Sequence, residues 1–187
     1  MRPTTSHEFD QAYQRPFTVW GDFRVPTEIA DLIRHRQPQR AFEAGCGSGR
    51  FSRYVAKQGV RVTGVDFSSV AIGKARARVA ADATPPEFLV GDVTKLVQVE
   101  GPYDCGFDVG CFHCLDEAGQ RAYASEVARI LKPSGTHLFW ALDTTPTNEH
   151  LMPARIEQVF HSSFRLQEAR TSRRRLARSH WYWLVRL

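Results

Sequence analysis

The stretch AFEAGCGSGRFS, residues 41–52, places three glycines at alternate positions, Gly45, Gly47 and Gly49, directly after a short apolar run. Glycine has no Cβ and adopts positive φ angles without a steric penalty, so this spacing allows a tight turn and a close approach of the backbone to another group. An apolar run, such a turn and then a helical pattern are typical of the ligand-binding edge of a parallel sheet. This stretch therefore predicts a strand, a loop and a helix.

The rest of the chain continues the alternation of strand and helix. Apolar runs predict strands at 40–44, 60–66, 86–92, 103–112 and 136–143, with helical patterns at 49–59, 68–82, 117–135 and 153–164. Two strand-like runs, 163–169 and 179–187, follow closely enough to form an antiparallel hairpin. We therefore predict an α/β fold with a Rossmann-like, doubly wound, seven-stranded sheet, mostly parallel with an antiparallel C-terminal strand.

Length and composition limit the class of protein. We expect 187 residues to form a single domain over 1–187, in which residues 1–25 are an aromatic N-terminal lid and 26–187 the sheet core. No apolar run approaches the ~20 residues that cross a bilayer, and the first residues lack the apolar core of a signal peptide. The cysteine spacing favours reduced thiols. We expect a cytoplasmic protein without a membrane partner, and the oligomeric state stays open.

The net charge of +5 is concentrated in RTSRRRLAR, residues 170–178, which holds five arginines. Such a cluster could bind the phosphates of a nucleic acid. Aromatic side chains on which bases could stack are not interleaved with these arginines, so the pattern favours a solvated turn between the last two strands. Nucleic acid is therefore not the partner that we expect. An enzyme that acts on RNA or protein and docks through this cluster is the alternative.

Two common nucleotide-binding loops match the glycines less well. The dinucleotide fingerprint requires a small residue where this chain has Arg50, whose long side chain would crowd the packing of helix on strand. The loop that binds nucleoside triphosphates requires a lysine, and none follows these glycines.

Five segments, EAGCGSGRFS, VTGVDFS, GDV, YDCGFDVGCFHCL and ARILKPSGTHLFW, resemble in this order the motifs of the class I S-adenosylmethionine (SAM)-dependent methyltransferases. A looser likeness relates the small size and the lead-in FTVWGDF to small-molecule methyltransferases of the thiopurine and tellurite type. The resemblance implies SAM as cofactor, S-adenosylhomocysteine as product and a small-molecule acceptor with an oxygen, sulfur or nitrogen nucleophile. A SAM-binding protein without turnover is the alternative outside enzymes.

The resemblance also assigns cofactor contacts to matching positions. It implies that Asp66 accepts hydrogen bonds from the ribose hydroxyls, that Phe67 stacks on the adenine, and that Asp92 and Val93 contact the adenine amino group and ring. The local alternatives are a helix cap or turn for Asp66, a core position for Phe67 and a turn for Asp92. The expected cofactor-binding residues are Glu43, Gly45, Cys46, Gly47, Gly49, Asp66, Phe67, Asp92, Val93, Gly110, Cys111, Trp20 and Arg24.

Glu43 stands inside an otherwise apolar strand. A buried ionised carboxylate without a partner is costly. We therefore expect Glu43 either to meet the ammonium group of the cofactor through water or to be neutral.

The sequence GCFHCL, residues 110–115, lies where the family places groups that face the acceptor. The resemblance implies that Gly110 and Cys111 line the methionine side of the cofactor. His113 has an ordinary pKa near neutrality and is the candidate general base or substrate-orienting group, with a packed core histidine as the alternative. Neighbouring strand residues point to opposite faces, so His113 and Cys114 should not converge on zinc, and we expect no metal site.

Aromatic residues recur every three or four positions in the N-terminal segment, at Phe9, Tyr13, Phe17, Trp20 and Phe23. We expect this segment to close over cofactor and acceptor as a lid, with Trp20 and Arg24 nearest the methionine part and Arg24 pairing with its carboxylate. The alternatives are permanent packing on the flank of the sheet and a dimer surface.

Overall fold

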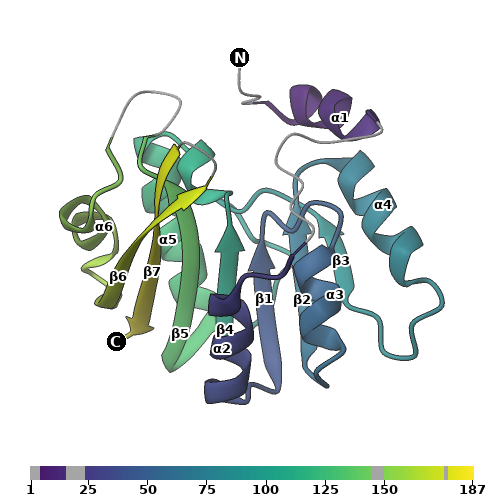
Figure 1. Ribbon diagram of the computed structural model, residues 1–187, viewed down its shortest axis with the longest axis horizontal. Coiled ribbons are helices and arrows are strands. Elements are labelled where there is room, and N and C mark those ends of the chain that lie inside the picture. Colours follow the sequence, from purple (N-terminus) through teal and green to yellow (C-terminus); the bar gives the residue numbers. More distant parts are fainter. Residues whose placement is uncertain (1–4, 16–23, 145–149, 175–176) are drawn as a thin grey trace.

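The computed structural model describes residues 5–15, 24–144, 150–174 and 177–187. Its centre is a seven-stranded sheet with strand order β3-β2-β1-β4-β5-β7-β6 (Figure 1). Strands β1 to β5 pair in parallel, and β7 is antiparallel to both β5 and β6. The predicted fold class is therefore confirmed. The strands are β1 Arg40–Ala44, β2 Arg61–Asp66, β3 Glu87–Val90, β4 Tyr103–Val109, β5 Leu131–Leu142, β6 Phe164–Arg174 and β7 Ala177–Arg186.

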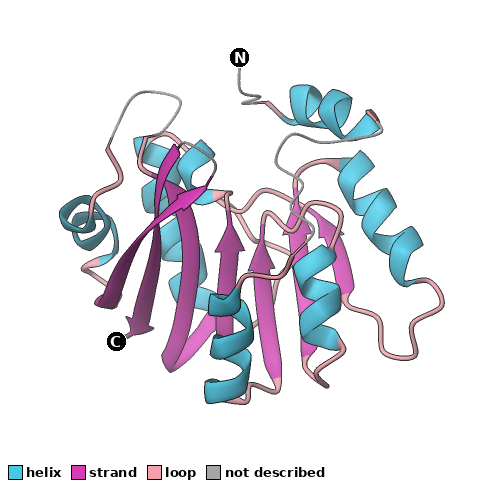
Figure 2. Ribbon diagram, in the orientation of Figure 1, coloured by secondary structure: helices cyan, strands magenta, loops and turns pink. Residues whose placement is uncertain are grey.

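Helices cover both faces of this sheet (Figure 2). One face packs against α2 and α3, and the other packs against α5 and α6. The short helix α1 lies over α4 at the edge where the strands end (Figure 1). The helices are α1 Ser6–Gln14, α2 Thr27–Arg36, α3 Arg50–Ala56, α4 Ser69–Val79, α5 Glu117–Ile130 and α6 Pro153–Phe160, with a 3-10 turn η1 at Phe112–Cys114.

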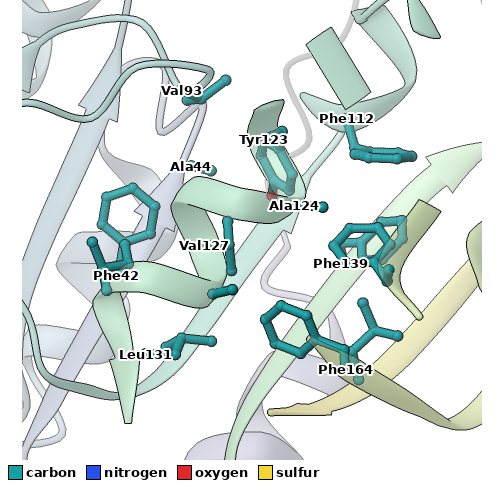
Figure 3. Packing of buried hydrophobic residues seen from close by; sticks show 14 of the residues in the cluster. Phe42, Ala44, Val93, Phe112, Tyr123, Ala124, Val127, Leu131, Phe139 and Phe164 are labelled. Carbon is teal, nitrogen blue, oxygen red and sulfur yellow. The ribbon is translucent and has the colours of Figure 1, made fainter. Parts of the chain in front are cut away.

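The larger core lies between the sheet and α5. Tyr123 and Val127 of α5 are wholly buried and face Phe42 of β1 and Phe139 of β5 (Figure 3). These α5 residues belong to the apolar face that three- and four-residue spacing predicts. The ring of Phe112 lies 5.0 to 5.5 Å from three neighbouring aromatic rings, so the end of β4 is anchored in aromatic packing.

Strand β4 is shorter than predicted. It ends at Val109, because Gly110 has a φ of +99° and residues Phe112–Cys114 form the 3-10 turn η1. The predicted strand to residue 112 was wrong here. The alternation of side chains that argued against a shared metal site therefore does not apply to His113 and Cys114.

Strands β5 to β7 are longer than predicted. The helix α5 ends at Ile130, and β5 begins at Leu131, although a Lys-Pro-Ser-Gly sequence follows. A register shift after the pair Tyr103 and Leu131, with Ser134 at φ +63°, lets the strand accommodate this sequence as a bulge. Strand β6 extends to Arg174, and strand β7 begins at Ala177. Most of the arginine cluster therefore lies on strands and not in a turn.

Candidate functional site

The loops that follow β1, β2, β3 and β4 meet at one edge of the sheet, because these strands are parallel neighbours. They carry the glycine-rich loop, the pair Asp66 and Phe67, the pair Asp92 and Val93, and the turn 110–114. In an open parallel sheet the crevice at this edge is the usual ligand site. The site residues that were predicted on these loops are thus brought to one edge.

The three glycines are each required by close packing inside the protein. All three have positive φ angles, between +52° and +74°. A Cβ on Gly45 would lie 2.5 Å from the Cβ of Cys111, and one on Gly47 would lie 2.6 Å from the hydroxyl of Tyr13. A Cβ on Gly49 would lie 2.4 Å from the ring of Phe88. Among the atoms of the protein, the nearest neighbours of these positions are thus side chains from α1, from β3 and from the turn after β4, and the role of the glycines in cofactor binding stays a prediction.

Cys46, between the first two glycines, is buried with Ile72, Ala75, Val79 and Phe88 beneath α4. Its backbone N–H donates to the carbonyl of Val65, 3.0 Å away. Its carbonyl accepts a hydrogen bond from the N–H of Gly49, 2.9 Å away, so Cys46 supports the loop through packing and backbone hydrogen bonds.

Asp66 ends β2 and joins two loops. Its Oδ2 accepts a hydrogen bond from the N–H of Gly47 at 2.8 Å, and its Oδ1 accepts one from the N–H of Ser68 at 2.9 Å. Burial raises the pKa of Asp66, although the two backbone hydrogen bonds act in the opposite direction. The carboxylate is therefore held in a fixed orientation, and each oxygen retains a lone pair for a further donor.

Helix α1 covers this part of the edge. The carboxylate of Asp10 accepts hydrogen bonds from the hydroxyl of Ser68 and from the N–H of Val70, 3.2 Å away, at the beginning of α4. The ring of Phe9 lies 5.1 Å from that of Phe67, whose side chain is 39% exposed. The ammonium group of Lys74 donates to the carbonyl of Tyr13. Within the described part of the N-terminal segment, helix α1 thus packs beside Phe67, one of the predicted site residues.

Asp92 and Val93 differ in exposure. Asp92 is exposed, and its Oδ1 accepts hydrogen bonds from the N–H and hydroxyl of Thr94, at 2.8 and 2.7 Å. This is the local turn that was the alternative for this residue. Val93 is buried beside Ala44 in the main core (Figure 3). Of the two side chains, only that of Asp92 reaches the surface.

Glu43 is buried in the middle of β1. Its Oε2 accepts hydrogen bonds from the N–H of Ser52, at 2.8 Å, and from the Ser52 hydroxyl. Burial raises the pKa of Glu43 to about 8, and the charges of Asp108 and Asp66 add to the rise. Of the two outcomes that we expected, the neutral form is the one that the surroundings favour near pH 7.

The turn after β4 carries the residues that were predicted to face the methyl acceptor. The N–H of Gly110 donates to the carbonyl of Trp140, 3.1 Å away, and Cys111 packs against Gly45. The imidazole of His113 is 7% exposed and meets the ring of Trp140 edge-on, with 5.7 Å between the ring centroids. Within the described part of the chain, no group of three or more His, Cys, Asp or Glu side chains could hold a metal ion.

Three other predicted features lie elsewhere. Trp20 falls outside the described residues, and Arg24 is exposed just before α2. Of the arginines in the cluster, Arg170, Arg173 and Arg174 lie on β6 and Arg178 lies on β7, at the far end of the sheet from β1 to β3. Arg170 lies 4.8 Å above the ring of Trp183 and 2.7 Å from Glu168, so one aromatic ring does pair with the cluster in space.

Sequence reasoning missed three residues that shape this edge. Asp10 connects α1 to α4, Ser52 satisfies Glu43, and Asp108 holds the turn after β4. The bond of Asp10 joins segments far apart in the sequence, whereas Ser52 and Asp108 lie within two of the motifs, whose pattern did not indicate these hydrogen bonds. Among the described residues, no helix has the length and apolarity to cross a membrane.

Known proteins of similar sequence define the class. The methyltransferase domain family matches residues 41–135, which is more than half of the chain. The chain therefore belongs to the methyltransferase family. This confirms the resemblance to the class I SAM-dependent methyltransferases that the motifs indicated.

Individual relatives agree with this family. An uncharacterized methyltransferase of Schizosaccharomyces pombe is 30% identical over 92 residues, which are 49% of this chain and 63% of the relative. A malonyl-[acyl-carrier protein] O-methyltransferase of Enterobacter lignolyticus is 30% identical over 149 residues, with 75% of this chain and 56% of that protein covered. The chain thus spans less than two thirds of the length of these relatives.

Solved structures share the fold. The N-methyltransferase NodS of Bradyrhizobium japonicum, in complex with S-adenosylhomocysteine, has a TM-score of 0.79 at 16% identity, covering 98% of this chain and 99% of NodS. A TehB-like SAM-dependent methyltransferase of Corynebacterium glutamicum has a TM-score of 0.73 at 20% identity, covering 97% and 98%.

Proposed function

We propose that this protein binds SAM at the carboxyl ends of β1 to β4 and transfers its methyl group to a small organic acceptor, with S-adenosylhomocysteine as the product. The observation that carries the proposal is Asp66, a carboxylate fixed by the amides of Gly47 and Ser68 at the edge where four loops meet. A carboxylate oriented in this way suits the two hydroxyls of a ribose. Family membership gives the class of reaction.

The other side chains of the edge suit an adenosine group. The partly exposed ring of Phe67 offers a flat surface for the adenine, and the Oδ2 of Asp92 is available to an exocyclic amino group. Val93 would support this region from the core, and Gly110 and Cys111 would line the methionine side. Glu43, the three glycines, Cys46, Trp20 and Arg24 complete the proposed set of cofactor-binding residues.

We also propose that residues 1–25 act as a lid on a core of residues 26–187. Helix α1 already contacts this edge at two points. Its Tyr13 contacts the glycine-rich loop, and its Phe9 contacts Phe67. A cover of this kind excludes water from the reacting groups and must open for ligands to exchange.

The cofactor would supply a methyl group on a good leaving group, and the protein would supply alignment, a dry site and a proton acceptor. His113 is the proposed acceptor of that proton, or the group that orients the methyl acceptor, because the turn 110–114 holds it at the same edge as Asp66. The edge of the Trp140 ring limits how far the imidazole can rotate.

Calorimetry with S-adenosylhomocysteine tests the proposed cofactor site. We expect the wild-type protein to bind this product, and Asp66→Asn to bind it about tenfold or more weakly, since a charge-assisted hydrogen bond becomes a neutral one. Asp31→Asn, which changes an exposed carboxylate on α2, should bind like the wild type. Absence of binding by the wild-type protein would contradict the proposal.

Methyl-labelled SAM, incubated with the protein and fractions of small metabolites, would identify the acceptor by the mass of the labelled product. On that acceptor, His113→Ala should lower kcat by about 100-fold if the imidazole takes the proton. The matched control is His161→Ala, at an exposed position after α6. An unchanged kcat in His113→Ala would remove the catalytic role of His113.

A further inference from the structure

A chain of buried polar side chains runs beneath the turn that follows β4. Asp108 near the end of β4, Tyr123 in α5 and His137 in β5 each have 0% exposure. The hydroxyl of Tyr123 lies 3.1 Å from Oδ2 of Asp108 and 3.0 Å from Nε2 of His137. Polar groups in an aromatic core are costly unless they are hydrogen-bonded to one another. These three residues come from three different elements, and the hydroxyl of Tyr123 links the other two.

The direction of these hydrogen bonds follows from the chemistry of the groups. In the ionised form of Asp108 the carboxylate only accepts, so in that form the hydroxyl of Tyr123 donates to it. The remaining interaction then requires His137 to donate from Nε2 to the oxygen of Tyr123. Burial lowers the pKa of His137 to about 3, so its imidazole is neutral and does not add a charge to this core.

Asp108 uses its other lone pairs on the turn itself. Its Oδ1 accepts a hydrogen bond from the N–H of Cys111 at 2.7 Å, and its Oδ2 accepts one from the N–H of Phe112 at 2.8 Å. These two amides stand immediately before His113 in the chain. One carboxylate therefore closes the turn, and Tyr123 fixes that carboxylate from below.

The turn has little freedom where it meets the glycine-rich loop. A methyl group on Gly45 would lie only 2.5 Å from the Cβ of Cys111, so the side chain of Cys111 packs directly against the backbone of Gly45. A small displacement of Cys111 would therefore change both this contact and the position of His113. Small errors in the position of reacting groups reduce rates strongly.

We infer that Asp108, Tyr123 and His137 are positioning residues for methyl transfer, which hold the turn 110–114 against the glycine-rich loop and so place His113 and Cys111. All three act through the turn, since their own side chains are wholly buried. The inference rests on the proposed function, because that function makes the turn the acceptor-facing part of the site.

Amide hydrogen exchange, resolved by NMR, tests the hold on the turn without any ligand. In the wild-type protein we expect the amides of Cys111 and Phe112 to exchange about 100-fold more slowly than unprotected amides. Tyr123→Phe should speed exchange at these two amides by about tenfold, since the carboxylate loses its third donor. The matched control is Tyr182→Phe, which removes another buried tyrosine hydroxyl, bonded to the carbonyl of Leu151.

Asp108→Asn provides a second variant, because it keeps the shape of the side chain and removes one of the two carboxylate oxygens. It should also shift the amide proton signals of Cys111 and Phe112 upfield, a signature that a general loss of stability does not produce. Rapid exchange of these amides in the wild-type protein, or equal effects of Tyr123→Phe and Tyr182→Phe, would overturn the inference.

Binding and turnover separate this inference from the proposed function. Tyr123→Phe should lower kcat on the identified acceptor by about tenfold while its KM changes by less than about threefold. If the wild-type protein fails to bind S-adenosylhomocysteine, the proposed function fails. The amide exchange rates would still show whether the three residues fix the turn 110–114. Altered exchange with an unchanged kcat would leave the three residues a structural role only and contradict positioning.

Discussion

The two halves of the site each place a buried carboxylate near the end of a strand, but they use it differently. Asp66, on the β1 to β3 side, binds backbone amides of two separate loops and keeps a path to the surface edge. Asp108, on the β4 to β5 side, binds its own turn and a tyrosine, and it is sealed by aromatic rings. A carboxylate can therefore order a loop either as part of a ligand site or from behind it.

The surroundings of Asp66 and Asp108 also change the pKa of each carboxyl group. Burial raises the pKa of both carboxyls, and that of Asp108 rises to about 7. Both are held by backbone hydrogen bonds, which favour the charged form. Glu43, between them on β1, has a pKa raised to about 8, mainly by burial. The middle of the sheet thus concentrates acidic groups whose charge depends on pH near neutrality.

The largest expected effect concerns the packing that holds the β1 to β3 half together. Gly49→Ala should lower the free energy of unfolding by about 3 kcal/mol, because its φ of +74° is unfavourable for alanine and the new methyl group would collide with Phe88. Gly59→Ala is the matched control, since its φ is +84° but its Cβ would meet open space. It should cost about 1 kcal/mol. Urea denaturation measures both, and equal losses would contradict the packing role.

An intermediate effect concerns the pH dependence of stability. Above pH 6.5 the folded protein retains protons on Glu43 and Asp108 that the unfolded chain has already lost, so the free energy of unfolding should fall as pH rises to 8. His137 opposes this trend only below pH 6.5, because its pKa is about 3 in the folded state. Glu43 should account for about 1 to 2 kcal/mol of the fall.

Glu43→Gln isolates that contribution, because glutamine still accepts a hydrogen bond from the N–H of Ser52 and does not titrate. Denaturation at pH 6.5 and at pH 8.0 should show a smaller decrease in stability for the variant than for the wild type. The same decrease in both proteins would show that Glu43 does not carry a raised pKa.

The smallest expected effect concerns helix α1, which lies over the half of the site that contains Asp66. Asp10→Asn weakens a charge-assisted contact with the N-terminus of α4, so the free energy of unfolding should fall by less than about 1 kcal/mol. Exchange of the α1 amides should nevertheless increase several-fold, because Asp10 makes two of the hydrogen bonds that join α1 to the beginning of α4. If α1 exchanges as slowly in the variant as in the wild type, Asp10 is not what holds the helix.

Local patterns predicted the β1 to β3 half better than the β4 to β5 half. The glycine-rich loop and Asp66 each lie in a short motif directly after a predicted strand, and the N-cap of α4 at Ser68 could also be predicted from its side chain. The hydrogen bonds that fix Asp108 beneath the turn 110–114 depend on Tyr123, 15 residues further along the chain, and on His137 in the neighbouring strand β5. In sequence these two residues match an apolar helix face and a buried strand.

The beginning of β5 could not be predicted for a related reason. The Lys-Pro-Ser-Gly sequence is an ordinary end of a helix. In the fold, Lys132 pairs with Asp104 at 2.6 Å, and the bulge at Ser134 lets the strand continue past the proline. The neighbouring strand β4 provides what the local sequence does not indicate. Long-range pairing overrides local preference at this position.

The attachment of α1 has a kinetic consequence. Asp10, Phe9 and Tyr13 bind a single short helix to α4 and to the glycine-rich loop, so a spent cofactor could leave only after these contacts break. With α1 as the proposed lid over the proposed cofactor site, we therefore expect departure of the product, and not the transfer itself, to set the turnover rate at saturating concentrations. A burst of product in the first turnover, followed by a slower steady state, would be the signature of this sequence of events.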